Sequence, residues 1–357
     1  MKQIMLKKEA ILHSLEKLYT NSPRIEISDN DRFVVFSDLH MGNGGMNDDF
    51  AKNSHLLDFV LNNYYLKRNY KLILNGDVEE LYKFSLKAVA KKWQNIYETF
   101  NKFHQQTGLY KIIGNHDHLL GYAKELPYKF PIIDSLIMDY KGSNIFIYHG
   151  HQTANLFEQY SMMVHYSVKY LFRTVGNNSV PMINQKEFQT EKIAYEFAKQ
   201  KNIVSVLGHT HRPLFESLSK IESLKYMLEN LINMYYKSTN GIRENLEYKI
   251  KLLKNELETA TKVNYSINSV GSIYNDEVIV PCLFNSGAVT GKRGITALEI
   301  KNGKIKLIYW FDRNRSQRYL EDYRQVETRH IPNSNYYKAI LRKSKLDYIF
   351  TRIKLLA

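Results

Sequence analysis

The stretch Phe33-Val34-Val35-Phe36-Ser37-Asp38-Leu39-His40 decides the fold class of this chain. A short apolar run bounded by polar residues is typical of a buried strand. The run is followed at once by a carboxylate and an imidazole, Asp38 and His40, which are both common metal ligands. Open α/β sheets bind ligands at the carboxyl ends of their strands, so the stretch predicts a metal-binding loop at such an edge. An Asp-x-His pair alone is weak evidence, and its weight depends on the rest of the chain.

Similar loops follow apolar runs farther along the chain. They are Asn75-Gly76-Asp77 after 72–74, Gly114-Asn115-His116-Asp117 after 109–113, His149-Gly150-His151 after 145–148, and Gly208-His209-Thr210-His211 after 203–207. Seven of the 12 histidines lie in these loops, in the first one, or directly beside them: His40, His116, His118, His149, His151, His209 and His211. Chance does not cluster one residue type so strongly at strand ends, so the loops predict one shared metal site.

The ordered set Asp-x-His, Gly-Asp, Gly-Asn-His-Asp, His and Gly-His-x-His resembles the calcineurin-like metallophosphoesterase superfamily. The resemblance covers roughly residues 33 to 217. It implies an α/β fold of the αββα four-layer sandwich type, in which two facing mixed sheets are flanked by helices. It also implies a single metallophosphoesterase domain over 1–357 and a hydrolase that acts on phosphoester bonds.

Metal ions suit this chemistry because a phosphoester anion repels hydroxide. Two cations about 3.5–4 Å apart lower the pKa of a water and hold both the entering and the leaving oxygen. By resemblance, the ligands of the first metal are Asp38, His40 and His211, Asp77 bridges the two metals, and Asn115, His149 and His209 bind the second. Two divalent metal ions are expected; this ligand set tolerates several metals, of which Mn is expected first, with Fe or Zn as alternatives.

The resemblance gives His116 a separate role beside the metals. It implies in-line attack on phosphorus by a metal-bridging hydroxide, while His116 assists the departing oxygen and Asp117 orients His116. A neighbouring carboxylate favours the charged imidazolium, which suits acid catalysis. Three further residues stay open between a role at the site and a plain surface or turn role, namely Asn43, His151 and Arg212.

Apolar periodicity predicts the secondary structure between these loops. Helices are expected at 1–19, 48–67, 79–104, 153–175 and 185–200, and strands at 33–36, 70–74, 109–113, 132–138, 143–148, 278–284, 294–300 and 305–311. Two insertions are expected, a helical cap-like segment at 152–200 and a helical hairpin at 217–263 that turns at 238–241. The alternation of strand and helix argues for a layered α/β sheet.

The charge of the chain favours anionic partners. It has 50 Lys and Arg against 36 Asp and Glu, a formal net charge of +14. The segment 319–357 is expected to be a basic C-terminal tail. Cys282 is the only cysteine, so no disulfide forms within the chain, and the first 19 residues lack the apolar core of a signal peptide. We therefore expect a cytoplasmic protein.

Three functions remain open at this stage. The first is hydrolysis of a phosphodiester, pyrophosphate or nucleotide-like small molecule, and the second is a nuclease that acts on a nucleic acid backbone. The third is a non-catalytic scaffold on the same fold. Gly76-Asp77-Val78-Glu79-Glu80 and the insertion after His149 are similar to the branch of UDP-diacylglucosamine pyrophosphohydrolase. Peripheral membrane contact and the oligomeric state are left open.

Overall fold

The computed structural model describes residues 2–123, 125–153, 183–218, 220–238, 240–265, 279–317, 319–320 and 326–357. The helices are α1 (Lys2–Asn21), α2 (Ser54–Val60), α3 (Leu86–Lys92), α4 (Gln94–Gln106), α6 (Ile183–Lys201), α7 (Lys220–Lys237), α8 (Asn240–Tyr265) and α9 (Leu346–Leu356). Short helical turns are η1 (Leu61–Tyr65), η2 (Leu66–Arg68), η3 (His118–Tyr122) and η4 (His151–Thr153).

The larger sheet has eight strands in the order β12-β13-β11-β10-β2-β3-β4-β5. They are β2 (Arg32–Phe36), β3 (Lys71–Asn75), β4 (Leu109–Ile112), β5 (Ile132–Ile133), β10 (Ile295–Lys301), β11 (Lys304–Asp312), β12 (Glu327–His330) and β13 (Tyr336–Lys345). The strands from β2 to β5 are parallel to one another, and all other pairings in this sheet are antiparallel. The sheet is therefore mixed.

The smaller sheet has five strands in the order β1-β6-β7-β8-β9. They are β1 (Arg24–Ile27), β6 (Ser135–Tyr140), β7 (Ser143–Tyr148), β8 (Val204–Leu207) and β9 (Leu283–Asn285). One core cluster joins Val35 and Ile300 of the larger sheet to Ile147 and Val206 of the smaller one, so the two sheets face each other. The apolar runs of β2, β3 and β8 are almost entirely buried, as is typical of strands covered on both faces. The single strand predicted at 132–138 is wrong, because this segment is divided between β5 of the larger sheet and β6 of the smaller one.

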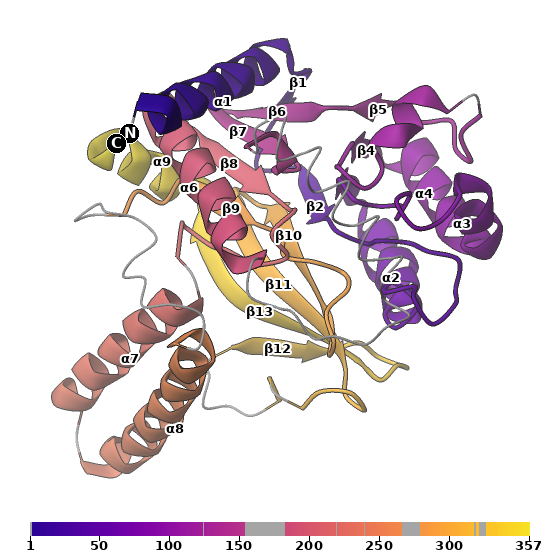
Figure 1. Cartoon of the computed structure of the whole chain (residues 1–357). Coiled ribbons are helices and arrows are strands. Elements are labelled where there is room, and N and C mark those ends of the chain that lie inside the picture. The colour runs from indigo at the N-terminus through magenta and orange to yellow at the C-terminus, as the bar shows by residue number, and fades with distance from the viewer. Residues whose placement is uncertain are drawn as a thin grey trace.

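Helices pack on both sheets from outside and cover part of their outer faces (Figure 1). Leu15 of α1 and Ala194 of α6 belong to the same core cluster as the smaller sheet. A second cluster packs Leu57 of α2 and Phe100 of α4 against Val34 and Leu72 of the larger sheet. The predicted α/β sandwich of two mixed sheets with flanking helices is confirmed.

Two predicted helices differ from the structure in their extent. The helix expected at 48–67 starts only at Ser54, because the Asp48 carboxylate accepts hydrogen bonds from the backbone N–H groups of Gly44 and Phe50 and thereby fixes a turn. The helix expected at 79–104 is two helices, α3 and α4, after a loop. The Ser85 hydroxyl caps the start of α3 by accepting from Ala88 N–H.

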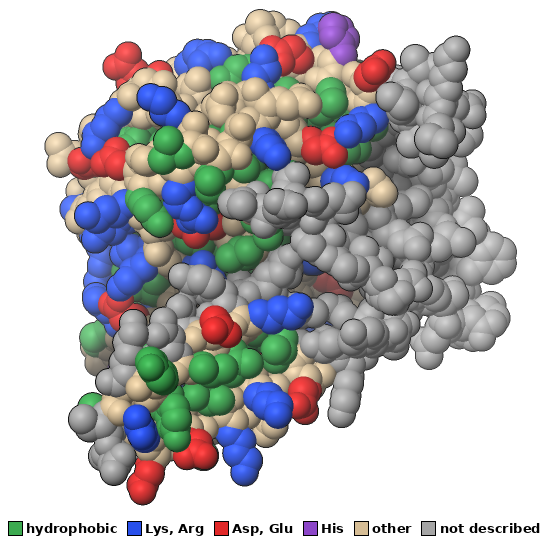
Figure 2. All heavy atoms as spheres, turned by 90° about the vertical axis from the view of Figure 1, so that its left-hand side faces the viewer, with side chains coloured by type: hydrophobic (Ala, Val, Ile, Leu, Met, Phe, Trp, Pro, Cys, Tyr) green, Lys and Arg blue, Asp and Glu red, His purple; other side chains and the backbone are tan. Residues whose placement is uncertain are grey.

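The predicted insertions are described in part. Residues 154–182 of the expected cap lie outside the described residues, while α6 coincides with its second helix. Helices α7 and α8 form the predicted hairpin with a small core of its own, made of Leu224, Leu231, Leu246 and Leu253. Figure 2 shows hydrophobic side chains flanked by charged ones on the hairpin surface, at the bottom of the view.

The C-terminal segment differs most from its prediction. Instead of a tail, residues 336–345 form β13, which pairs with β11 over its whole length. Helix α9 then buries Leu346, Ile349 and Ile353 in the main core cluster. The prediction is correct about the basic composition of this segment but wrong about its structure. In the sequence, lysines on the open face of a strand cannot be told apart from lysines of a solvated tail. None of the described helices has an apolar stretch long enough to span a membrane.

Candidate metal centre

All five predicted ligand loops meet at one place between the two sheets. Asp38 and His40 follow β2, Asp77 follows β3 and Asn115 follows β4, while His149 follows β7 and His209 and His211 follow β8. Three groups of side chains have ligand atoms within 4.8 Å of one another: Asp38, His40 and His211; His40, Asp77 and His116; and Asp77, His149 and His209. The structure therefore brings residues from both sheets to one centre.

Left-handed backbone angles bend the ligand loops sharply. Five of the predicted ligands have positive φ: Asp38 (55°), His40 (49°), Asp77 (52°), His209 (63°) and His211 (56°). Residues with side chains rarely adopt this conformation, and it persists where the surrounding structure enforces it, often at functional sites. Gly76 also has φ of 80°, and a Cβ there would collide with the His149 ring, so only glycine fits beside this histidine.

The first group is centred on the Asp38 carboxylate. His211 Nε2 lies 3.2 Å from Asp38 Oδ1, and His40 Nε2 lies 3.9 Å from the same oxygen. The two imidazole Nε2 atoms are 3.1 Å apart. The backbone N–H of His209 donates to the Asp38 carboxylate and locks the two loops together. One carboxylate oxygen and two imidazole nitrogens thus converge on a common point.

Asp77 lies between this group and the second one. Its Oδ2 is 3.9 Å from His40 Nε2 on one side and 3.1 Å from His149 Nε2 on the other. Its Oδ1 accepts a hydrogen bond of 2.8 Å from the backbone N–H of His116. Burial opposes ionisation, but the surrounding imidazoles hold the pKa of Asp77 well below its usual range. The side chain is therefore an ionised carboxylate between two sets of imidazoles.

His149 and His209 complete the second group. The Asn75 carbonyl accepts from His149 Nδ1 at 2.8 Å, so the Nε2 atom faces Asp77. Burial would lower the pKa of His149, but the Asp77 carboxylate outweighs it and raises the pKa to about 9. Burial and the neighbouring His149 lower the pKa of His209 to about 3. His209 is thus a neutral imidazole at neutral pH, the form that binds metals.

Asn115 has a buried amide oxygen in the loop next to Asp77. Its Oδ1 is buried and accepts no hydrogen bond from the described residues. The neighbours of Asn115 lie against Asp77, because the His116 N–H donates to Asp77 and a Cβ at Gly114 would collide with the Asp77 carboxylate. A buried amide oxygen without a donor costs free energy, and a cation would satisfy it. Carboxylate, imidazole and amide donors together fit divalent metal ions.

Glu80 holds two histidines of the centre, His40 and His116, in place. Its carboxylate accepts from His116 Nδ1 at 2.8 Å and from His40 Nδ1 at 3.1 Å, and only 2% of the residue is exposed. The orienting contact to His116 that the resemblance assigns to Asp117 is therefore made by Glu80. Burial lowers the pKa of His116, but the Asp77 and Glu80 carboxylates outweigh it and raise the pKa above its usual value.

Asp117 instead ties two ligand loops together. Its Oδ1 accepts from Gly114 N–H at 2.6 Å and its Oδ2 from Val78 N–H at 2.8 Å. The ammonium of Lys111 lies 3.3 Å from Asp117 and 2.6 Å from Glu79. All three charged side chains are at most 1% exposed. This buried ion network joins the loop of Asp77 to the loop of Asn115.

Residues 31–217 match the family model of calcineurin-like phosphoesterases. The chain belongs to this family. The match spans all five ligand loops and ends just before the α7–α8 hairpin. The comparison with curated proteins gives no match.

Solved structures similar to this calcineurin-like phosphoesterase share little sequence with it. A conserved uncharacterized protein (predicted phosphoesterase) from Streptococcus pneumoniae TIGR4 is 12% identical, with 79% of this chain and 89% of that chain covered and a TM-score of 0.29. A Vps29 single mutant from Entamoeba histolytica is 10% identical (78% and 92% covered, TM-score 0.31). The cold-active protein-tyrosine phosphatase of a psychrophilic Shewanella is 10% identical (79% and 78% covered, TM-score 0.33). At these values the likenesses carry no information on substrate.

Several residues that support the phosphoesterase loops have no local sequence signal. Glu191 of α6 is fully buried and accepts from the Thr210 hydroxyl at 2.9 Å and from Arg212 at 3.2 Å. The Asn285 amide donates to the Gly208 carbonyl at 2.7 Å. Both side chains fix the loop of His209 and His211. Each contact joins segments far apart in the chain, which periodicity does not reveal.

The three residues left open by the sequence analysis have defined surroundings. Arg212 forms an ion pair with Glu191, and Asn43 accepts from Gly45 N–H within an exposed turn. The His151 ring centre lies 5.5 Å from that of His149, so it packs beside a predicted ligand.

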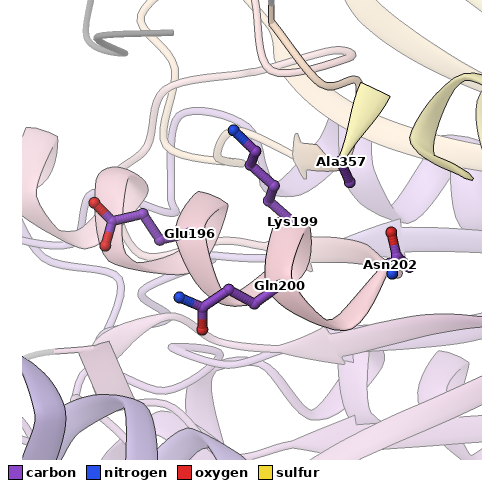
Figure 3. A pocket seen from close by; sticks show the side chains of 5 residues that line it. All are labelled: Glu196, Lys199, Gln200, Asn202 and Ala357. Atoms are coloured by element: carbon purple, nitrogen blue, oxygen red, sulfur yellow. The ribbon is translucent and has the colours of Figure 1, made fainter. Parts of the chain in front are cut away.

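A surface pocket of about 470 Å³ is separate from the metal centre (Figure 3). It is lined by Glu196, Lys199, Gln200, Asn202 and Ala357. Four of these residues lie at the C-terminal end of α6, before β8 begins, whereas the ligand histidines follow the other end of β8. The pocket therefore lies at the opposite ends of the strands of the smaller sheet from the ligand histidines, and it does not contribute to the predicted site.

Proposed function

We propose that this calcineurin-like phosphoesterase hydrolyses a phosphoester with two divalent metal ions. The observation that carries the proposal is the position of Asp77, whose carboxylate belongs to a ligand group on either side. Asp38, His40 and His211 would hold one ion with Asp77, and Asn115, His149 and His209 would hold the other. When bound, such ions activate water for attack on phosphorus and neutralise the charge of the phosphoryl oxygens.

His116 and Glu80 supply the proton chemistry in this proposal. The Asp77 and Glu80 carboxylates outweigh burial and raise the pKa of His116, which favours the protonated ring. Because Glu80 accepts at Nδ1, the opposite nitrogen, Nε2, is the one that faces Asp77, at 4.0 Å. A proton at Nε2 stabilises negative charge on the phosphoryl group or moves to the leaving oxygen. Glu80 keeps the ring in that orientation and stabilises its positive charge.

The substrate class we propose is a phosphodiester, a pyrophosphate or a nucleotide-like small molecule. The similarity of Gly76-Asp77-Val78-Glu79-Glu80 to the branch of UDP-diacylglucosamine pyrophosphohydrolase supports a pyrophosphate, and manganese is the metal we expect first. We favour a catalytic role over a scaffold role because the candidate metal groups include His116, the residue proposed for proton transfer, beside Asp77. A scaffold gains nothing from five ligands held in a left-handed conformation.

Phosphoester hydrolysis by the metal-stripped protein tests the proposal. Bis-p-nitrophenyl phosphate and p-nitrophenyl phosphate are offered with Mn, Zn, Mg or no added metal. We expect turnover that depends on metal, and the ratio between the two compounds separates diester from monoester preference. Absence of turnover with every metal, in protein that binds two equivalents, would refute hydrolysis and favour a scaffold.

Two variants separate the roles at the centre. His116→Ala should keep both metals and lose most of the turnover, by about 10²–10⁴-fold. Asp77→Asn should lose metal as well, which elemental analysis measures directly. His55→Ala, an exposed histidine of α2, is the matched control and should retain both properties. Loss of metal from His116→Ala would contradict the role proposed for His116.

A further inference from the structure

The larger sheet carries a row of positive charges that the metal centre does not use. We propose that this row binds the phosphate backbone of a nucleic acid. It consists of Arg32, Lys301, Lys304 and Lys345, one residue from each of the four adjacent strands β2, β10, β11 and β13. We call these four residues the cationic row.

The strand register places the cationic row on one face of the sheet. Lys301 is opposite Arg32 in one antiparallel pair and opposite Lys304 in the next, and Lys304 is opposite Lys345. Residues directly opposite in antiparallel strands point to the same side. Ile300 and Ile305, which alternate with row residues, belong to the core between the sheets. The row therefore lies on the outer face of the larger sheet.

A second line of charge runs parallel to the cationic row. Two residues farther along β11 and β13, Lys306 is opposite Lys343 on the same outer face. The carboxylate opposite Lys306 on β10 is Glu299, but it is 1% exposed and already forms an ion pair of 2.5 Å with Lys338. Glu327 of β12 pairs with Lys343 at the sheet edge. The row itself receives no comparable compensation.

The fold does not account for these like charges. Directly opposite like charges destabilise an antiparallel pair. Within the described parts of the chain, Lys301, Lys304 and Lys345 form neither an ion pair nor a side-chain hydrogen bond, and Arg32 donates only to the Arg68 carbonyl. Burial, then Arg32 and Lys306, lower the pKa of Lys301, and the opposing effect of Glu299 does not offset them. Unfavourable charge that is kept without a structural partner points to a ligand of opposite charge.

The shape of the row fits a phosphate backbone. Neighbouring strands are roughly 4.8 Å apart, so four of them span about 14 Å. Successive phosphates along one strand of duplex DNA rise about 3.4 Å, so this span corresponds to roughly four nucleotides. Contacts of this type bind without reading the base sequence.

The surroundings of the row disfavour a membrane as the partner. Proteins that lie on a bilayer combine basic residues with exposed apolar side chains that enter the acyl region. None of the large apolar side chains found exposed among the described residues belongs to β2, β10, β11 or β13. The row therefore offers charge alone, which suits a hydrophilic polyanion.

The cationic row is independent of the proposed phosphoesterase activity. Arg32 is the first residue of β2, whereas the ligand loop follows Phe36 at the other end of this strand. Five residues of strand span roughly 16 Å. The row therefore does not feed a reacting phosphate into the centre, and its binding does not require turnover. Failure of one proposal leaves the other intact.

Fluorescence anisotropy with labelled DNA tests the row. The probes are single-stranded and duplex DNA of about 20 nucleotides with phosphorothioate linkages, which resist hydrolysis, titrated with the full chain at several salt concentrations. The test variant replaces Lys301, Lys304 and Lys345 by Gln. The matched control replaces three exposed lysines of the hairpin, Lys225, Lys251 and Lys254, by Gln, with the same loss of charge.

We expect the control to bind nearly as the native chain does. The affinity of the test variant for DNA should fall by on the order of a hundredfold at about 0.1 M salt. The slope of log affinity against log salt concentration should become less steep by about two to three. Its thermal midpoint should be equal or higher, because like charges are removed, whereas a structural role would lower it. Equal loss in both variants, or no DNA binding by the native chain, overturns the proposal. Row-dependent sedimentation with phosphatidylserine vesicles without DNA binding assigns the row to a membrane instead.

Discussion

Replacing Lys111 by methionine tests how strongly the buried ion network holds the ligand loops. Methionine keeps most of the apolar stem of lysine but removes the charge. The Glu79 and Asp117 carboxylates, which are fully buried, then lose the ammonium at 2.6 and 3.3 Å. Removal of one partner from a buried ion pair destabilises proteins by about 3–5 kcal/mol, because the remaining charge stays out of water. We expect a loss of this size in the free energy of unfolding.

Acid should reduce this loss. Burial already raises the pKa of Glu79 above its ordinary value of 4.5, and the loss of Lys111 removes a cation that opposes this effect. A carboxyl group whose pKa is raised in the folded state contributes stability below its unfolded pKa and loses it as the pH rises. The difference between native chain and variant should therefore shrink as the pH falls toward 4.5 and be largest at neutral pH.

Urea unfolding of four proteins measures the effect. They are the native chain, Lys111→Met, Lys111→Met with Glu79→Gln, and Lys102→Met. The double variant should recover much of the stability, since a neutral amide replaces the Glu79 carboxylate and Asp117 keeps its two backbone donors. Lys102→Met changes an exposed lysine of α4 and should stay within about 0.5 kcal/mol. A loss below about 1 kcal/mol for Lys111→Met, or no recovery in the double variant, would refute the reasoning.

Two further predictions concern the metal centre. Glu80→Gln should reduce metal affinity or turnover by about 10–100-fold while the chain stays folded, because His40 and His116 lose the carboxylate that accepts from both. Metal titration measures the affinity, and the rate of phosphoester hydrolysis measures the turnover. Unchanged values of both would contradict the prediction. Binding of metal should release a proton, because Asp77 raises the pKa of His149 to about 9, against the effect of burial, and a ligand must be unprotonated. Metal affinity should thus rise with pH up to about 9, and calorimetry in buffers of different ionisation enthalpy counts the proton; heats that are independent of the buffer contradict this.

The sequence predicts which loops converge at the centre because their signal is local. A buried strand and the polar residues directly after it are neighbours in the chain, so Asp38 and Asp77 are found by reading a few residues each. The apolar runs predict a layered α/β sheet, while the two-sheet sandwich was expected from the family resemblance. In contrast, β1 is absent from the prediction, because its four residues Arg24–Ile27 have only one fully buried side chain and no apolar run.

The partners of the ligands were not predictable in the same way. Glu80 contacts His40 and His116, which lie 40 and 36 positions away in the chain. The stretch Gly76–Glu80 shows the branch similarity but does not show which histidines Glu80 holds. The resemblance pointed to Asp117 because this residue follows His116 directly. In the structure, the carboxylate turns toward Gly114, Val78 and Lys111 instead. Contacts between loops are set by how the strands pair, which a single sequence does not contain.

The distances within the centre depend on how the two sheets pack. Asp77 follows β3 of the larger sheet and His149 follows β7 of the smaller one, yet their ligand atoms are 3.1 Å apart. The core between the sheets, which includes Ile73 and Ile147, fixes this separation together with the hydrogen bond from His149 to the Asn75 carbonyl. Protein interiors are close-packed, so a change of one methylene in that core moves the sheets relative to each other. Metal affinity should therefore respond to substitutions in the core that never touch a ligand.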